Sequence, residues 1–136
     1  MIISVDHGNK SIKTPNALFT SGLIVSEGLQ GFKTDYICWN NKYYTLTEQR
    51  IAYLRDKTED ERFYVLTLFA IAKELERIAA ERKKAEENLR RIEAKLANES
   101  FTSRAPENVV NAEREKAEKA RALIAKLDAS AATMKL

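Results

Sequence analysis

EDERFYVLTLFAIAKELERIAAERKKAEENLRRIEAKLA, residues 59–97, decides the fold of this chain. The stretch has no glycine or proline, and its apolar residues recur in steps of three and four, the period of an amphipathic α-helix. At 1.5 Å per residue, a helix from Glu59 to Asn98 is about 60 Å long. Thr58 and Glu61 fit a capping box at its start. The sequence therefore predicts one long helix that begins near residue 59.

A second helical segment follows a loop that we expect at residues 98–106. Pro106 suits the first position of a helix, and the apolar spacing continues after it. Folding back at the loop gives a long antiparallel helical hairpin, a coiled coil, with Leu89 opposite Ala117. The predicted seam consists of Leu68, Ile71, Leu75, Ile78, Arg82, Ala85, Leu89, Ile92 and Leu96 on one helix. On the other helix it consists of Val110, Glu113, Ala117, Ala120, Ile124, Leu127, Ala131 and Met134, so that Arg82 and Glu113 are its two charged interruptions.

The residues before the long helix have a different composition. All four glycines lie within the first 31 residues, and short β-branched or aromatic runs alternate with turn residues. Tyr36–Trp39 and Lys42–Thr45 flank a two-residue Asn-Asn turn, which indicates a β-hairpin. Further short strands are expected at residues 2–5 and 11–14, around an Asp6–Asn9 turn. Another is expected at residues 17–25, interrupted at Gly22.

The predicted fold class is therefore α+β, a small antiparallel β meander followed by a long helical hairpin. We expect a β-rich domain at residues 1–58 and a two-helix coiled coil at residues 59–136. A two-helix seam buries little apolar surface, so packing of Phe63, Leu66 and Phe69 against the β-rich part should anchor the base of the hairpin.

Composition excludes several classes of function. The chain has 136 residues and a net charge of +3, which does not indicate a protein that coats nucleic acid along its whole surface. A lone Cys38 and a single histidine argue against a disulfide framework and a structural zinc site. No apolar run reaches membrane-spanning length, and the first residues lack a signal-peptide pattern. We expect a cytoplasmic protein with no membrane contact, no cofactor and no metal.

Three blocks in order resemble the amino-terminal stretch of ParM/StbA-type actin-like plasmid-segregation ATPases. They are MIISVDHGNKSIKT, LFTSGL and NKYYTLTEQRIAYLRDKTEDERFYVLTLFAIAKELE, which together cover residues 1–76. The resemblance implies a fragment of an actin-like lobe whose first hairpin is a phosphate loop. By this resemblance Asp6 would help place the nucleotide's metal ion through water, and the nucleotide-binding residues would be Asp6, Gly8, Asn9 and Lys13.

The remainder of an actin-like ATPase is not found after residue 76. Nucleotide would normally lie between two large lobes, and the later phosphate loop and adenosine pocket are absent from this sequence. An ordinary hairpin turn is the alternative interpretation of Asp6–Asn9, and His7 alone has no orienting partner that would make it a general base. We therefore expect no ATP hydrolysis, and nucleotide binding at most as a remnant.

The segment KLANESFTSRAPENVVNAEREKAEKA, residues 95–120, resembles a second family. It is similar to the tip of the carboxy-terminal coiled-coil arm of valyl-tRNA synthetase, and the resemblance extends over residues 76–130. It implies an arm that lies against the tRNA elbow and performs no chemistry. The enzyme's aminoacylation core, editing domain and anticodon-binding bundle are absent from this sequence.

Candidate RNA contacts follow from charge and aromatic content. Phe101 is the one aromatic residue placed to stack on a base, although it equally fits a plug at the hairpin tip, between Asn98, which ends one helix, and Pro106, which begins the next. Basic residues along the first helix and at the tip form a stripe that could reach phosphates, but glutamates interleave with them, so a solvated coiled-coil face is the alternative. These candidates are Lys83, Lys84, Arg90, Arg91, Lys95 and Arg104, together with Phe101.

The two resemblances meet near residues 74–78, which gives the chain the pattern of a chimera. A natural recombination, a mispredicted gene or a designed sequence would each produce it. The sequence favours a non-catalytic binding module, not an enzyme, that binds tRNA or another structured RNA through the arm. The alternative is a protein-interaction module, such as an inhibitor or assembly factor, that uses the hairpin or an exposed β edge. A remnant nucleotide-binding fragment is a third and more distant interpretation.

Overall fold

A computed structural model describes residues 3–28 and 35–134 of the chain. Ile2, where the first strand was predicted to begin, lies outside these residues. The elements are β1 (Asp6–His7), β2 (Ser11–Lys13), β3 (Leu18–Thr20), β4 (Leu23–Ser26), β5 (Tyr36–Trp39), β6 (Lys42–Leu46), α1 (Glu61–Ala97), α2 (Glu99–Arg104) and α3 (Glu107–Ala132). This order confirms the predicted α+β class.

The described residues divide into two compact units that meet at Glu74 and Leu75. The composition changes near residue 58, whereas the units meet later along the chain, because the first turns of α1 pack into the core of the first unit. The boundary falls at the start of the stretch where the two sequence resemblances meet.

The first hairpin of the chain differs from its prediction. Asp6 and His7 were expected in a turn, but they form β1 and pair with Lys13 and Ile12 of β2, respectively. The turn lies at Gly8 and the residues after it. The imidazole Nε2 of His7 lies 2.7 Å from Oγ1 of Thr67 on α1, and this hydrogen bond holds β1 against the helix while the backbone of β1 pairs with β2.

Gly22 separates two strands, as the sequence predicts. β3 belongs to a sheet of order β1-β2-β3, and β4 belongs to a second antiparallel sheet of order β4-β6-β5. A Cβ atom on Gly22 would lie 2.3 Å from the carbonyl oxygen of Gln49 and 2.4 Å from that of Thr47. Only glycine permits this close approach, which lets the chain cross from one sheet to the other.

The predicted hairpin of β5 and β6 is confirmed. Asn40 and Asn41 both have positive φ angles, 49° and 60°, as a two-residue turn of type I′ requires. Asparagine tolerates this conformation better than most residues. The turn sets the register, in which Trp39 pairs with Lys42 and Tyr36 with Thr45.

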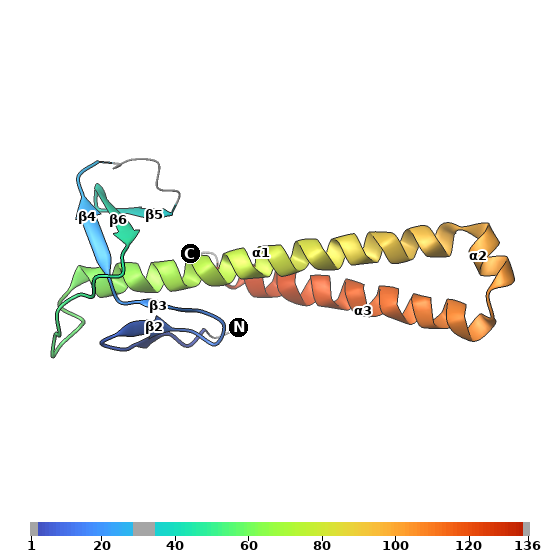
Figure 1. Cartoon of the computed structure of the whole chain (residues 1–136), viewed down its shortest axis with the longest axis horizontal. Coiled ribbons are helices and arrows are strands. Elements are labelled where there is room, and N and C mark those ends of the chain that lie inside the picture. Colours follow the sequence, from blue (N-terminus) through green and yellow to red (C-terminus); the bar gives the residue numbers. More distant parts are fainter. Residues whose placement is uncertain (1–2, 29–34, 135–136) are drawn as a thin grey trace. The chain divides into compact units, whose positions relative to one another are not determined.

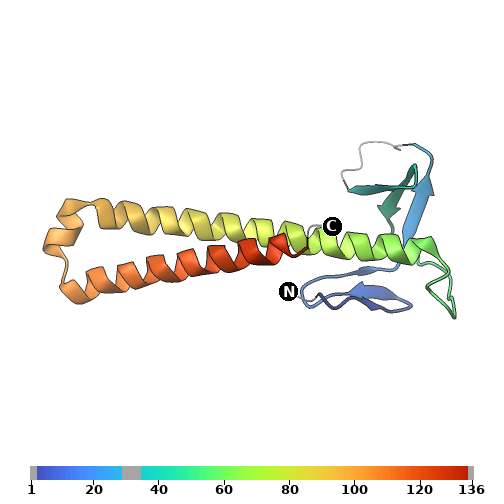
Figure 2. The same cartoon turned by 180° about the vertical axis from the view of Figure 1, so that it is seen from behind.

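The core of the first unit lies between the sheets and the first turns of α1. Figures 1 and 2 show the two sheets on opposite sides of this part of the helix. The predicted anchors Phe63, Leu66 and Phe69 are all buried here, which confirms their role. Their buried partners in the cluster are Ile12, Leu23, Tyr44, Ile51, Val65 and Ala70.

The start of α1 corrects the predicted capping box. The helix begins at Glu61, and the N-cap is Asp60, whose Oδ1 accepts a hydrogen bond of 2.9 Å from the backbone N–H of Arg62. Thr58 donates its hydroxyl hydrogen bond to Asp56 instead. Asp56 thus competes for the hydroxyl group of Thr58, and Asp60, two residues further along the chain, caps the helix instead.

The second unit is an antiparallel hairpin of the later part of α1 and α3, with α2 at its tip (Figures 1 and 2). Where a loop was predicted, residues 99–104 form the short helix α2. Asn98 caps this helix, because its Oδ1 accepts a hydrogen bond of 3.0 Å from the N–H of Ser100. Pro106 is the N-cap of α3 and not its first helical residue.

The predicted seam of this unit is confirmed. Every seam position from Leu75 to Leu96 and from Val110 to Met134 is buried or half-buried, including the two charged interruptions. Leu89 is half-buried, and it shares a groove with Ile124 and Ala125, further along α3 than its predicted neighbour Ala117.

Candidate nucleic-acid interface

Arg82, the charged interruption of the seam on α1, forms ion pairs with carboxylates of both helices. Nε of Arg82 lies 2.6 Å from a carboxylate oxygen of Asp128 on α3, and its Nη1 lies 2.9 Å from Glu86. The hydrogen bond to Asp128, together with the nearby negative charges, raises the pKa of Arg82. An arginine therefore fits the seam because its long side chain reaches acceptors at the edge.

The charged interruption on α3 is satisfied in the same way. The carboxylate of Glu113 is buried, and its Oε1 lies 2.9 Å from Nζ of Lys116 and 3.1 Å from Nζ of Lys95. These two hydrogen bonds, the one from Lys116 first, lower the pKa of Glu113 below its ordinary value. Lys116 is not among the predicted RNA contacts, although its position three residues after Glu113 was a usable signal.

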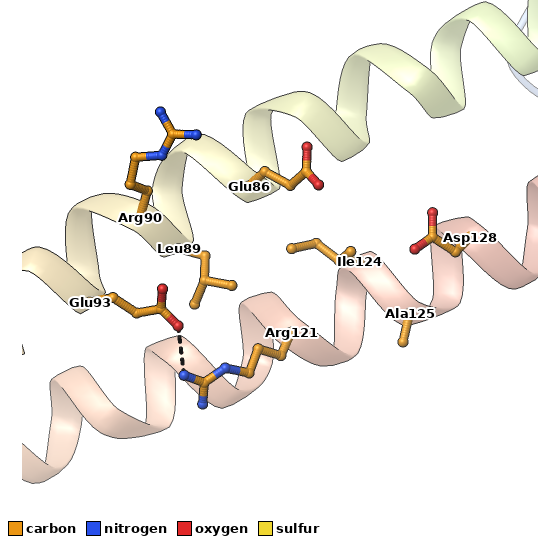
Figure 3. Close-up of a pocket in the computed structure, with 8 residues that line it drawn as sticks. All are labelled: Glu86, Leu89, Arg90, Glu93, Arg121, Ile124, Ala125 and Asp128. Carbon is orange, nitrogen blue, oxygen red and sulfur yellow. Dashed lines mark hydrogen bonds and ion pairs between the residues drawn. The ribbon is translucent and has the colours of Figure 1, made fainter.

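One edge of the hairpin carries a groove between α1 and α3, and an ion pair between the two helices bridges it. Figure 3 shows this groove, with Glu93 of α1 reaching Arg121 of α3 at 2.7 Å. Leu89 and Ile124 form its apolar part, and Arg90 directs its guanidinium away from α3. Three carboxylates and two guanidinium groups line the groove. They are Glu86, Glu93, Asp128, Arg90 and Arg121.

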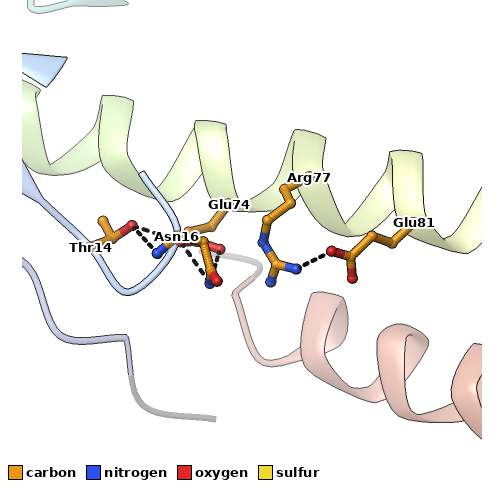
Figure 4. Close-up of polar contacts among 5 residues, drawn as sticks. All are labelled: Thr14, Asn16, Glu74, Arg77 and Glu81. Atoms are coloured by element: carbon orange, nitrogen blue, oxygen red, sulfur yellow. Dashed lines mark hydrogen bonds and ion pairs between the residues drawn. The ribbon is translucent and has the colours of Figure 1, made fainter. Parts of the chain in front are cut away.

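Ion pairs hold most of the glutamates that interleave with the predicted basic stripe. Glu81 accepts an ion pair of 2.7 Å from Arg77 (Figure 4), while Glu86 and Glu93 pair as described above. Four predicted RNA contacts on α1 are exposed and form no ion pair with any residue that the structure describes. They are Lys83, Lys84, Arg90 and Arg91. Glu87 is also exposed and forms no ion pair with the described residues, so between residues 83 and 91 the outer face of this helix carries these four cations against one free carboxylate.

The tip residues have different surroundings. Nζ of Lys95 lies 4.8 Å from the ring centroid of Phe101, a cation–π distance, and the same ammonium group pairs with Glu113. Phe101 is half-buried, and Arg104 is exposed in the last turn of α2. Lys95 is thus engaged within the hairpin, whereas Arg104 forms no ion pair among residues 3–28 and 35–134.

The four residues implied as a phosphate loop all lie in the hairpin of β1 and β2. Asp6 and Lys13 lie opposite each other on β1 and β2 and are exposed, and Asn9 is exposed in the turn. At Gly8 a Cβ atom would lie 2.8 Å from the carbonyl oxygen of Ser11, so the tight turn itself requires glycine. This geometry also fits the alternative interpretation, an ordinary hairpin turn.

Polar contacts fasten this hairpin to α1 on its inner side. Burial, and then the charge of Lys57, lowers the pKa of His7, which favours the neutral imidazole. At the other end of the hairpin, the buried carboxylate of Glu74 accepts hydrogen bonds from Thr14, at 2.7 Å, and Asn16, at 3.2 Å (Figure 4). These contacts hold the hairpin of β1 and β2 against α1.

Two further properties are plain from the described residues. Within them, no three histidine, cysteine, aspartate or glutamate side chains are grouped closely enough to hold a metal ion. None of the helices in the described part of the chain is long and apolar enough to cross a membrane.

An antiparallel helical arm with a capped tip and a cationic outer face defines the second unit. Residues 70–135 match a family model described as the valyl tRNA synthetase tRNA binding arm. This finding confirms the arm resemblance predicted for residues 76–130. This part of the chain is therefore similar to a tRNA-binding arm.

Individual relatives agree with the family match. The chain is 37% identical to a valine–tRNA ligase of Clostridium acetobutylicum over 71 residues, which are 52% of this chain and 8% of the ligase. For the Clostridium perfringens ligase the identity is 52% over 52 residues, which are 38% of this chain and 6% of the ligase. For the Staphylococcus saprophyticus ligase the identity is 49% over 49 residues, which are 36% of this chain and 6% of the ligase.

The chain thus spans less than a tenth of the length of these relatives. No solved structure gives a significant match. The comparisons do not support the resemblance of residues 1–76 to plasmid-segregation ATPases, nor the interpretation of the chain as a chimera. They support the resemblance of residues 70–135 to the arm of the synthetase.

Proposed function

We propose that this chain is a non-catalytic RNA-binding module whose helical hairpin binds tRNA. The observation that carries the proposal is the match of residues 70–135 to a tRNA-binding arm. The charge arrangement agrees with it, because Glu81, Glu86 and Glu93 are held in ion pairs while neighbouring cations stay exposed. Exposed lysine and arginine side chains attract phosphates and release bound counterions.

The proposed contacts are those of the exposed outer face and the tip. Lys83, Lys84, Arg90 and Arg91 would supply charge along α1, and Arg104 would supply it at the tip. Phe101 is the candidate for stacking on an exposed base, and Lys95 holds its ring from one side. We assign no chemistry to the module, since the arm resemblance implies binding alone.

Affinity for a tRNA transcript across a salt series tests the proposal. Replacing the four α1 cations Lys83, Lys84, Arg90 and Arg91 with glutamine should weaken binding and flatten the log–log salt dependence, by somewhat less than one unit per lost contact. The matched control replaces four exposed cations of the first unit with glutamine, for the same change in net charge. These are Lys10, Lys42, Arg50 and Arg55.

Phe101→Ala separates stacking from plugging of the tip. A ring that stacks on a base should contribute about 1–3 kcal/mol to binding, with little change in the melting temperature. A ring that only closes the hairpin tip should lower the melting temperature and leave affinity nearly unchanged. Undetectable binding of the wild-type chain at low salt would refute the RNA proposal and leave a protein-interaction module as the alternative.

A further inference from the structure

The two long edges of the helical hairpin differ in their charge. The groove of Figure 3 is lined by three carboxylates and two guanidinium groups, and the pair of Glu93 with Arg121 closes it. A second groove runs between α1 and α3, and its polar lining residues are Asn88, Glu113, Lys116 and Lys119. Lysine therefore outnumbers carboxylate in the second groove, the reverse of the first.

Helix periodicity extends this basic lining along α1. Lys84, Asn88, Arg91 and Lys95 follow one another at intervals of four, three and four residues, so they occupy one face of the helix. Asn88 lines the second groove, and Lys95 pairs with Glu113 of the same groove. The cations of this face therefore border that groove, whereas Arg90 borders the other.

The one carboxylate that lines the second groove lies below its cations. Glu113 is only 8% exposed, while the side chains of its partners Lys95 and Lys116 are 47% and 61% exposed. The acid thus draws two ammonium groups together without itself reaching the surface. Lys119 and Lys84 form no ion pair within the described part of the chain.

We infer that the edge bordered by Lys84, Arg91, Lys95, Lys116 and Lys119 is the surface that meets the phosphate backbone of RNA. This inference rests on the proposed function. Lysine ammonium groups bind phosphates as point charges, and the amide of Asn88 offers a donor to phosphate or sugar oxygens. The edge of Figure 3 offers phosphates less, because its carboxylates repel them and hold Arg121 and Arg82 in pairs, which leaves Arg90 as the unpaired guanidinium among the described residues that line it.

A charge reversal on each edge tests the assignment in the full chain. Lys119→Glu changes the basic edge, and the matched control Arg114→Glu changes an exposed cation on the same helix. Arg114 lies on the other edge, four residues before Glu118 and seven before Arg121 on the same face of α3. At 0.1 M salt, Lys119→Glu should weaken binding of an unmodified tRNA transcript roughly tenfold and lower the salt slope by about one. Arg114→Glu should leave both within error.

The outcomes separate this inference from the proposed function. Equal weakening by the two variants, or stronger weakening by Arg114→Glu, overturns the edge assignment and leaves RNA binding in place. Wild-type chain that does not bind tRNA at low salt overturns the proposed function and the edge assignment together. Helicity and melting curves verify that the variants are folded. If Lys119→Glu is unfolded, Lys84→Gln takes its place, and it should lower the salt slope by the same amount. Its matched control is Arg114→Gln.

Discussion

The first unit and the helical hairpin bury their apolar side chains in different ways. In the first unit two sheets and a helix enclose large residues, and Ile12, Val65 and Leu66 have no exposed surface. In the hairpin only two helices meet, and many seam positions are small, such as Ala85, Ala117 and Ala120. A side chain enclosed from several directions loses more contacts on truncation than one in an open seam.

The difference also explains where charge is tolerated. A seam two helices wide is never far from solvent, so Arg82 and Glu113 reach partners at its edges. In the first unit the buried carboxylate is that of Glu74, and the side chains of Thr14 and Asn16 donate hydrogen bonds to it. Four predictions test this comparison, beginning with the largest effect.

Leu66→Ala should cause the greatest loss of stability. The side chain is fully buried, so its removal leaves a cavity, and we expect the free energy of unfolding to fall by roughly 3–5 kcal/mol. Urea denaturation followed by the fluorescence of Trp39 measures it. The control is Leu18→Ala, the same change at a leucine that is 70% exposed, which should have a small effect. Similar losses from the two would contradict the described core.

Ile92→Ala should destabilise the hairpin by a smaller amount. Ile92 is buried on the seam, but the two helices can close partly around the gap, so roughly 2–3 kcal/mol is expected. Urea denaturation followed by the circular dichroism of the helices measures this loss. Leu123→Ala, at a residue that is 46% exposed, provides the comparison and should cost much less.

Glu113→Gln should make the hairpin less sensitive to acid. Because Lys116 and Lys95 lower the pKa of Glu113 in the folded state, the carboxylate stabilises the fold above the unfolded-state pKa, about 4.3. This stabilisation is lost as the pH falls through the lower, folded-state pKa. The melting temperature of the wild type should therefore exceed that of Glu113→Gln near neutral pH, and the gap should close in acid. A gap that is constant with pH would contradict the ionic role of Glu113.

Glu87→Ala should have the smallest effect. Glu87 is exposed and forms no ion pair with the residues that the structure describes, so the change in the free energy of unfolding should stay within about 0.5 kcal/mol. Thermal unfolding followed by circular dichroism checks it. A loss as large as that from Ile92→Ala would show that α1 presents a different face to α3.

The sequence by itself determined the elements whose signals are local. The spacing of apolar residues predicted the seam, Asn40 and Asn41 predicted the turn of type I′, and Gly22 predicted the break between strands. Each depends on backbone conformation or periodicity over a few residues, which a single sequence displays. The anchors Phe63 and Leu66 were predicted for the same reason, as apolar residues at helical spacing.

Only the tertiary structure decided which side chains meet. His7 lies in a strand and forms a hydrogen bond with Thr67 on α1, and Thr58 lost its capping role to Asp60 because Asp56 competes for its hydroxyl. From the sequence alone, a basic stripe along α1 and a solvated face with interleaved glutamates were both possible interpretations. Which charges are neutralised depends on long, flexible side chains that reach across to α3, and the sequence spacing within one helix does not specify that register.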